Sequence, residues 1–134
     1  MAGDEIRVPI QSDGDLVTAR QKGRELARQM GFTPTDLALI ATAISELARN
    51  IVLYAQQGEI ILVSVENSNR RGIKVVAQDE GPGIPDVDRA LKAGFSTSRS
   101  LGLGLPGVKR LMDEFEIASE VGRGTTVTVR KWKA

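Results

Sequence analysis

The first thirty residues carry one strand pattern and one helix pattern. Polar and apolar residues alternate from Glu5 to Ile10, and this period of two predicts a strand. A helical repeat follows, which we expect Asp13 or Asp15 to cap and Gly31 to close. The apolar face of this helix consists of Leu16, Gly23, Leu26 and Met30.

The next segment predicts a longer helix. Thr33 is a helix-capping residue placed directly before a proline, and Asp36 is an acid three residues after that cap. We expect this helix to run to about Gln57 and to be stopped by Gly58.

The remainder of the chain predicts four strands, one helix and a long connection rich in glycine, proline and serine. The strands are expected at residues 59–67, 72–79, 115–121 and 125–132, with turns at 68–71 and 122–124. The helix is expected at 105–113, with Leu105, Val108, Leu111 and Met112 on its apolar face. The connection, from residue 80 to 104, shows only a short helix pattern around 86–92, and so long a connection in a compact domain is usually a functional lid.

This order of elements predicts the fold class. A strand, two helices, two strands, a connection, a helix and two strands indicate an α/β protein of the α+β kind, a two-layer sandwich. Its sheet should be mixed but largely antiparallel, with the helices on one face. The 134 residues suit a single domain over residues 1–134, and the chain contains no internal repeat.

The chain contains neither cysteine nor histidine. This composition excludes disulfides, cysteine-ligated metals and thiol nucleophiles, and it removes the commonest general base. Any catalysis must therefore use carboxylates, amides, hydroxyls, Lys or Arg, backbone N–H groups or a cation held by oxygen. That set favours phosphate chemistry over a hydrolytic triad.

The charge balance changes the expected partners. Eighteen basic and seventeen acidic residues leave a net charge of +1, which offers no electrostatic footprint for nucleic acid. No apolar run approaches the ~20 residues of a membrane span, and the N-terminus lacks a signal-peptide pattern. We expect a cytoplasmic protein with neither nucleic-acid nor membrane partners.

Glycine is concentrated in the second half of the chain. The run Gly102-Leu103-Gly104-Leu105-Pro106-Gly107 leads directly into a predicted helix. Free N–H groups and the positive end of the helix dipole would make this run an anion site. The run also fits the G-x-G-x-x-G motif of dinucleotide-binding folds. However, no buried strand precedes it and the chain ends soon after it, so we reject that fold.

Two further places combine polar residues with an apolar setting. Glu46 and Asn50 lie about 40° apart on one helical face, flanked by Leu39, Ala43 and Leu53. They could hold Mg²⁺ and orient a nucleophile, or Glu46 could be a solvated rim residue. Asp79 continues the inward series of a buried strand and is followed by Gly81 and Gly83. It could accept a hydrogen bond from an exocyclic amine such as that of adenine, or it could belong to an ordinary turn.

Four motifs therefore occur in order along the chain. They are Glu46-x-x-x-Asn50, Asp79-x-Gly81-x-Gly83, Gly102-x-Gly104-x-x-Gly107 and Gly124-Thr125-Thr126. Together they resemble the motifs of the GHKL, or Bergerat-fold, ATPase superfamily, which includes gyrase, MutL, a heat-shock chaperone and histidine kinases. The short chain and the runs at 44–50 and 96–104 resemble the branch of anti-sigma factors and serine kinases. Residues 105–115 are most similar to the switch kinases of bacterial stressosomes.

The resemblance implies binding of ATP with Mg²⁺ and a role for each matched residue. Asn50 would ligate Mg²⁺, Glu46 would be the catalytic base, and Asp79 would bind the adenine amino group. Gly81 and Gly83 would shape the adenine pocket, and Thr125 would assist through a water molecule. The phosphates would be received by Gly102, Leu103, Gly104 and Gly107. Residues 80–101 would form an ATP lid, in which Arg99 either reaches a phosphate or is solvated.

The resemblance also implies a function. It favours an ATP-dependent protein serine kinase whose substrates are STAS-domain stressosome proteins, and which then binds and activates a metal-dependent serine phosphatase. Phosphoryl transfer depends on positioning and charge neutralisation, so it requires neither histidine nor cysteine. The alternative is an anti-sigma factor that sequesters a sigma subunit and phosphorylates its antagonist. A non-catalytic nucleotide-binding adaptor is disfavoured, because all four motifs keep their key residues.

Overall fold

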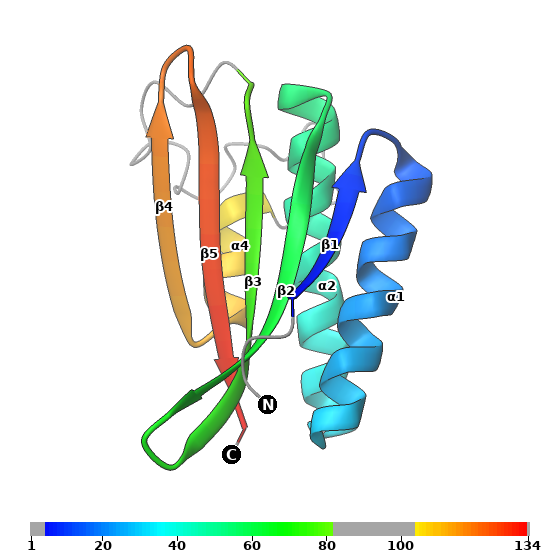
Figure 1. Cartoon of the computed structure of the whole chain (residues 1–134), viewed down its shortest axis with the longest axis vertical. Helices are drawn as coiled ribbons and strands as arrows, with labels where there is room; N and C mark the ends of the chain where they lie inside the picture. Colours follow the sequence, from blue (N-terminus) through cyan, green and yellow to red (C-terminus); the bar gives the residue numbers. More distant parts are fainter. Residues whose placement is uncertain (1–4, 82–103, 134) are drawn as a thin grey trace.

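A five-stranded antiparallel sheet forms one layer of the protein, and helices form the other (Figure 1). This computed structural model describes residues 5–81 and 104–133. The strands are β1 (Glu5–Ile10), β2 (Gly58–Asn67), β3 (Arg70–Asp79), β4 (Glu114–Glu120) and β5 (Gly124–Trp132). The helices are α1 (Asp13–Met30), α2 (Pro34–Asn50) and α4 (Gly104–Leu111), and a π-helical turn, η1 (Ile51–Ala55), continues α2. The predicted fold class is confirmed.

The strands lie in the order β1-β2-β3-β5-β4, and each neighbouring pair is antiparallel. The expected mixed pairing is therefore not seen among the described strands. Side chains alternate across the sheet, so Ile73, Val75 and Ala77 are buried on the inner face, as their spacing predicted.

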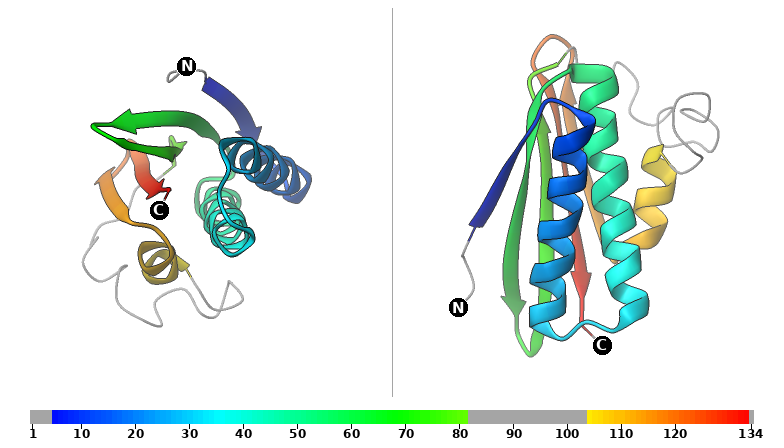
Figure 2. Two further views of the ribbon diagram at one scale, coloured as in Figure 1. Left: turned by 90° about the horizontal axis from the view of Figure 1, so that it is seen from below. Right: turned by 90° about the vertical axis from the view of Figure 1, so that its right-hand side faces the viewer.

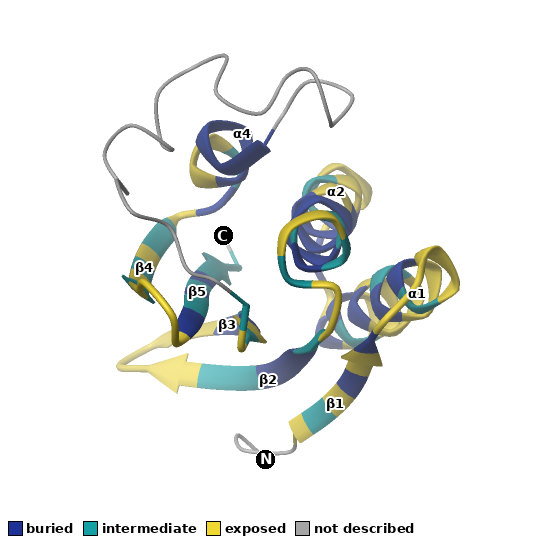
Figure 3. Ribbon diagram, turned by 90° about the horizontal axis from the view of Figure 1, so that it is seen from above, coloured by how far each residue is buried: buried dark blue, intermediate teal, exposed yellow. Residues whose placement is uncertain are grey.

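The helices cover only the inner face of the sheet (Figure 2). α1 and α2 pack on each other, and α4 packs on the opposite flank of α2 (Figure 3). Gly23 permits the close approach of α1, because a Cβ atom there would overlap Ile44 Cδ1. The core between the layers is centred on fully buried aliphatic side chains: Ile40, Ile44, Leu47, Ile60, Leu62, Ile73, Val75 and Val129.

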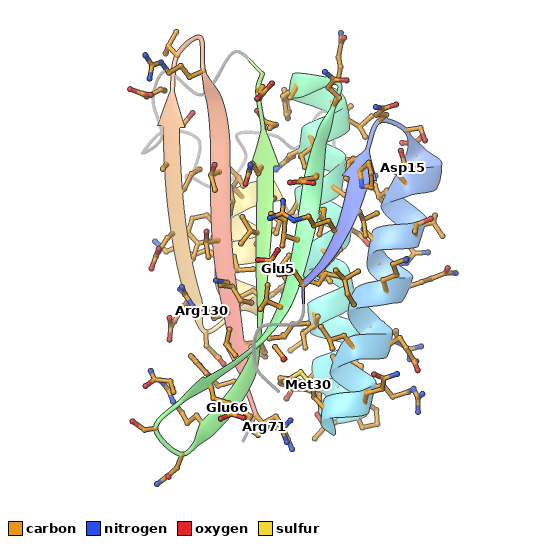
Figure 4. The ribbon with its side chains drawn as sticks, in the orientation of Figure 1. Glu5, Asp15, Met30, Glu66, Arg71 and Arg130 are labelled. Atoms are coloured by element: carbon orange, nitrogen blue, oxygen red, sulfur yellow. The ribbon has the colours of Figure 1, made fainter. Side chains whose placement is uncertain are left out.

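Charged side chains line the outer face of the sheet (Figure 4). Arg7 on β1 contacts Glu59 on β2 at 2.7 Å, and Arg130 on β5 lies 3.5 Å from Glu114 and 3.4 Å from Glu116 on β4. These cross-strand pairs suit an antiparallel sheet with one solvated face.

The start of α1 differs from the expectation. Ser12 is the N-cap, because its carbonyl accepts the first helical hydrogen bonds from Asp15 and Leu16. Asp15 instead lies in the first turn and reaches back, so that its Oδ2 accepts from the Gln11 N–H at 2.8 Å. Neither Asp13 nor Asp15 is the cap residue itself. The caps predicted at Gly31 and Thr33 are confirmed: Gly31 has a φ of 91°, and Thr33 accepts from the Asp36 N–H.

The end of the second helix also differs. The Gln56 N–H donates to the Ile51 carbonyl at 2.8 Å, five residues back, so the last turn is π-helical rather than α-helical. Gln56, with a φ of 72°, ends it. Gly58 is not the stop but the first residue of β2, where it pairs with Asp79 and a Cβ would overlap the Gln78 carbonyl oxygen.

The segment Pro34–Ala55 is long and apolar enough, by length and composition alone, to cross a membrane. Half of the most apolar 18-residue stretch of this segment is nevertheless buried inside the protein. There α2 contributes Leu37, Ile40, Ile44 and Leu47 to the core. Its hydrophobicity is therefore that expected of a core helix.

The first hairpin turn is tighter than predicted, and the second is shifted by one residue. Asn67 pairs with Arg70, so the β2–β3 turn is only Ser68 and Asn69, with Ser68 at a φ of 56°. Glu120 pairs with Gly124, so β5 starts one residue before the expected position and the turn comprises residues 121–123. α4 ends at Leu111, because the Asp113 N–H already donates to the Arg130 carbonyl of β5. The predicted helix around 86–92 and the lid from residue 82 onward lie outside the described residues, as do Gly83, Arg99, Gly102 and Leu103.

Candidate functional site

Four chain segments meet at one end of the molecule. The carboxyl ends of α2 and β3 and the β4–β5 turn lie at the top of Figure 1, and the amino end of α4 points towards this end from the middle of the molecule. This arrangement follows from the topology, since α2 and β3 run towards this end while α4 and β5 start from it. The candidate residues that the structure describes, from Glu46 to Asp79 and from Gly104 to Thr125, are thus carried to the same end of the fold.

The last turn of α2 holds polar atoms without partners. Glu46 is only 7% exposed, and its Oε2 is buried with no hydrogen-bond partner. Asn50 is half-buried and its Oδ1 is also unpartnered. Across residues 5–81 and 104–133, the same condition is found only at Arg49 Nε. Burial shows that Glu46 is not a solvated rim residue, and a buried polar atom left unpaired typically costs ~1–3 kcal/mol.

These two oxygen atoms fit the chemistry of a hard cation. Magnesium takes oxygen ligands and is usually held by one or two protein groups together with water and substrate phosphates. Among the described residues no group of three or more His, Cys, Asp or Glu could hold a metal by itself. The unpaired oxygen of Asn50, close along the helix to that of Glu46, therefore suits a cation that arrives with a phosphate ligand.

Two backbone groups hold Asp79 at the end of β3. Its Oδ1 accepts hydrogen bonds from the Gly81 N–H at 2.9 Å and from the Thr125 N–H at 3.2 Å. Because both bonds go to Oδ1, they fix the carboxylate group and leave Oδ2 outside this clamp. Asp79 is half-buried on the inner side of the sheet, as its place in the strand series predicted.

The glycines around Asp79 allow this close packing. Gly124 has a φ of 113°, and a Cβ atom there would overlap the Asp79 carbonyl oxygen. A Cβ on Gly81 would lie 2.6 Å from Ala55 Cβ and 3.2 Å from Asp79 Oδ1. Gly81 therefore lets the segment after β3 pass directly beside η1, at the end of the helix that carries Glu46.

Thr125 contacts Asp79 through its backbone, and the water-mediated role predicted for it stays a prediction. The bond to Asp79 comes directly from its backbone N–H, while its hydroxyl lies 2.8 Å from Ser119 Oγ. Ser119 also donates to the Gly124 carbonyl at 3.3 Å and so braces the β4–β5 turn. No motif in the sequence marks Ser119, because its role depends on a cross-strand pairing.

The amino end of α4 closes the described part of the site. Gly104, with a φ of 58°, and Gly107 are both buried in the first turn of α4, which packs on α2. The predicted apolar face of this helix is confirmed by the burial of Leu105, Val108 and Met112.

A hollow of about 240 Å³ lies at the same end, mainly on the outer side of the sheet. Its lining includes Pro9, Glu59 and Gln78, which occupy outward-facing positions and pair in one row across β1, β2 and β3, and it also includes Asp79 and Glu80 at the end of β3. The hollow is therefore mainly on the opposite side of the sheet from Glu46.

Comparison with known proteins decides the family. Residues 10–131 match the histidine kinase-like ATPase domain, and this range contains every candidate residue. The chain belongs to the histidine kinase-like ATPase family. The clamp on Asp79 and the unpaired oxygens of Glu46 and Asn50 are thus features of an ATPase-family domain.

Within the histidine kinase-like ATPase family, the chain is similar to a serine/threonine-protein kinase and to anti-sigma factors. The serine/threonine-protein kinase RsbT of Bacillus subtilis (strain 168) is 52% identical over 129 residues, covering 96% of this chain and 97% of RsbT. An anti-sigma F factor of Caldanaerobacter subterraneus subsp. tengcongensis is 32% identical over 120 residues, covering 85% and 82% of the two chains. An RsbT-like serine/threonine kinase of stress signalling is the function that these comparisons support.

A solved structure shares the fold. The crystal structure of the RsbU and RsbW domains of Rv1364c from Mycobacterium tuberculosis superimposes with a TM-score of 0.62 at 21% identity. The superposition covers 98% of this chain and 33% of that longer chain. The Bergerat-type sandwich is therefore shared over almost the whole chain.

Proposed function

We propose that this chain transfers the γ-phosphoryl group of Mg²⁺-bound ATP to serine residues of STAS-domain stressosome proteins. The observation that carries the proposal is the pair of unpaired buried oxygens on Glu46 and Asn50, at the same end of the fold as the clamped carboxylate of Asp79. The 52% identity to RsbT over nearly the full length of both chains supports the kinase activity.

Asp79 would bind the adenine ring. With Oδ1 held by the N–H groups of Gly81 and Thr125, Oδ2 would accept a hydrogen bond from the exocyclic amine. Gly81 and Gly83 would keep the pocket free of side chains beside this carboxylate. A carboxylate accepts without donating, so it favours an amine over a carbonyl at this position and thereby adenine over guanine.

Asn50 and the glycine-rich segment would hold the phosphates. The Asn50 Oδ1 would ligate Mg²⁺, which when bound would neutralise phosphate charge. Backbone N–H groups from Gly102, Leu103, Gly104 and Gly107 would receive phosphate oxygens at the start of α4. Residues 80–101 would cover the nucleotide, with Arg99 in reach of a phosphate.

Glu46 would act as the base in the transfer step. As the serine oxygen forms its bond to the γ-phosphorus, the bond from that phosphorus to the bridging oxygen of ADP breaks. The serine proton passes to the Glu46 carboxylate. Burial of Glu46 excludes competing water from this carboxylate, and no hydrogen bond within the described protein competes for its Oε2.

The partners follow from the same proposal. STAS-domain proteins would be the substrates, and a metal-dependent serine phosphatase would be bound and activated once the kinase is released from them. An anti-sigma role is the second candidate, favoured by the 32% identity to an anti-sigma F factor. The higher identity to RsbT supports the kinase role ahead of the anti-sigma role. Co-purification with a sigma subunit, rather than with a STAS protein or phosphatase, would reverse this order.

The test is a transfer assay with labelled ATP, Mg²⁺ and purified STAS-domain proteins, followed by mass spectrometry of the acceptor. We expect phosphoserine on a STAS protein with wild-type kinase, and almost none with Glu46→Gln. Glu116→Gln is the matched control, because Glu116 is exposed on the outer face of β4. Absence of transfer by the wild-type protein to any STAS protein would contradict the proposal.

A further inference from the structure

Arg49 is the third residue of α2 with a buried, unpaired polar atom. Its side chain is half-buried, and its Nε is sealed from solvent without an acceptor. Arginines elsewhere in residues 5–81 and 104–133 show how such groups are usually satisfied: Arg7, Arg71 and Arg130 contact acids, and Arg70 stacks on the Trp132 ring. A guanidinium donor buried without a partner is costly, so this position is built for an anion that arrives from outside the fold.

The obvious internal partner is not used. Glu46 lies three residues before Arg49, a spacing at which an acid and a base can pair on a helix. No salt bridge within 4.0 Å joins them, and both Glu46 Oε2 and Arg49 Nε lack partners. The charge of Arg49 is therefore left for an external anion.

The angular positions of Glu46, Arg49 and Asn50 around α2 indicate from which side the anion approaches. At 100° per residue, Asn50 lies about 40° to one side of Glu46, and Arg49 lies about 60° to the other. In the proposed reaction, which this inference rests on, Asn50 is on the nucleotide side of the base. Arg49 is then on the far side of Glu46 from the metal ligand, where the serine of the acceptor must approach.

We propose that Arg49 is a specificity-determining residue that binds the acceptor protein through a carboxylate next to the acceptor serine. A guanidinium forms two parallel hydrogen bonds to a carboxylate, which fixes orientation as well as position. The bound carboxylate would hold the serine hydroxyl in front of Glu46. The kinase would thus select STAS proteins with an acidic residue beside the acceptor serine.

The experiment separates acceptor binding from nucleotide binding. Arg49→Met removes the charge at similar length, and Arg49→Lys keeps the charge but loses the forked donor. Arg24→Met, at an exposed position on α1, is the matched control for losing one positive charge. Each variant is first compared with wild type by circular dichroism and thermal melting, and its affinity for ATP is measured by calorimetry. The acceptor is a STAS protein that the wild-type kinase phosphorylates.

We expect Arg49→Met to weaken acceptor binding and raise the acceptor KM by roughly 10–100-fold, with ATP affinity within about twofold of wild type. Arg49→Lys should recover part of that loss. Arg49→Glu should be rescued by a STAS variant in which the neighbouring acid is replaced by lysine.

Two outcomes would overturn the inference. An unchanged acceptor KM in Arg49→Met would show that the guanidinium does not touch the acceptor. A loss of ATP affinity with an unchanged acceptor KM would assign Arg49 to the phosphates instead. In both cases the wild-type kinase still transfers phosphate, so the proposed function stands. Failure of the wild-type transfer itself would overturn both.

Discussion

Asp79 combines a fixed position with a free acceptor. Its Oδ1 accepts hydrogen bonds from two backbone N–H groups. One belongs to Gly81, two residues away in the chain, and the other to Thr125, 46 residues away. One carboxylate oxygen therefore maintains the local structure and the other is left for a ligand. This division of labour allows a substitution that alters ligand binding while sparing the fold.

Asp79→Asn should lose most ATP affinity and keep its melting temperature. The amide oxygen can still accept hydrogen bonds from the N–H groups of Gly81 and Thr125. The amide NH₂ then faces the adenine amine, and because both groups are donors no hydrogen bond forms between them. Calorimetry should show at least a tenfold weaker Kd, corresponding to about 1.4 kcal/mol. Asp113→Asn is the matched control. The Asp113 carboxylate also accepts a hydrogen bond from a backbone N–H, that of Trp132 on β5, but it lies at the end of the fold opposite the candidate site. Unchanged ATP binding in Asp79→Asn would remove Asp79 from the adenine site.

Glu46→Gln should bind ATP normally but transfer phosphate roughly 10²–10⁴-fold more slowly, as expected for loss of a general base. Glutamine matches glutamate in size, so packing around α2 is retained. Single-turnover kinetics with a STAS acceptor measures the transfer step directly. A near-normal rate would reduce Glu46 to an orienting residue.

At the scale of elements, the β4–β5 turn positions the carboxylate of Asp79. Gly122 and Gly124 both adopt positive φ, at 85° and 113°, yet their surroundings differ. A Cβ on Gly122 would meet no atom within 4 Å, whereas one on Gly124 would overlap the backbone of Asp79 and Glu80. A substitution at Gly122 therefore introduces backbone strain alone, whereas one at Gly124 introduces both backbone strain and a steric overlap.

Gly124→Ala should destabilise the protein by roughly 3 kcal/mol or more and abolish ATP binding, because the Thr125 N–H can no longer reach Asp79. Gly122→Ala should cost roughly 1 kcal/mol, the strain of positive φ alone, and leave ATP affinity unchanged. Urea unfolding and calorimetry of both variants provide the comparison. Equal losses of stability in the two would contradict the steric argument.

Sequence patterns located the elements well but not their ends. β1 was predicted to the residue because one of its faces is buried, which makes the alternation strict. The π-helical turn and the positive φ of Gln56 were not predictable, because they arise where α2 must reach β2 beside the segment after β3. In the site, Glu46 and Asp79 were recognisable as polar residues in apolar series. Arg49 and Ser119 carried no such signal, since the first resembles an ordinary helical arginine and the second acts through a cross-strand partner.

At the scale of the whole molecule, the site is made from the ends of elements that are distant in the chain. α2, β3, α4 and β5 each contribute, and none of them can supply the site alone. A ligand that binds here contacts the native arrangement only, because the unfolded chain does not bring these ends together. Ligand binding and global stability should therefore be coupled.

Mg²⁺ with a non-hydrolysable ATP analogue, at about 100 times its Kd, should stabilise the wild-type protein by about 2.7 kcal/mol. For a domain of this size that corresponds to a melting-temperature increase on the order of 10 °C. In Asn50→Ala, which lacks the proposed Mg²⁺ ligand, the melting-temperature increase caused by the ATP analogue should be the same in Mg²⁺ as in EDTA. An increase in Asn50→Ala that still requires Mg²⁺ would place the metal on another residue.

The two strongest ultraviolet chromophores stand at opposite ends of the fold. The single tryptophan, Trp132, lies on the last strand, where its Nε1 donates to Glu114 at 2.7 Å and Arg70 covers its ring. The single tyrosine, Tyr54, is 45% exposed in η1, a few residues after Asn50. Indole fluorescence should consequently report unfolding and remain silent when nucleotide binds, whereas phenol absorbance should respond to the ligand. The chain thus carries its own pair of optical probes, one for each process, without added dyes.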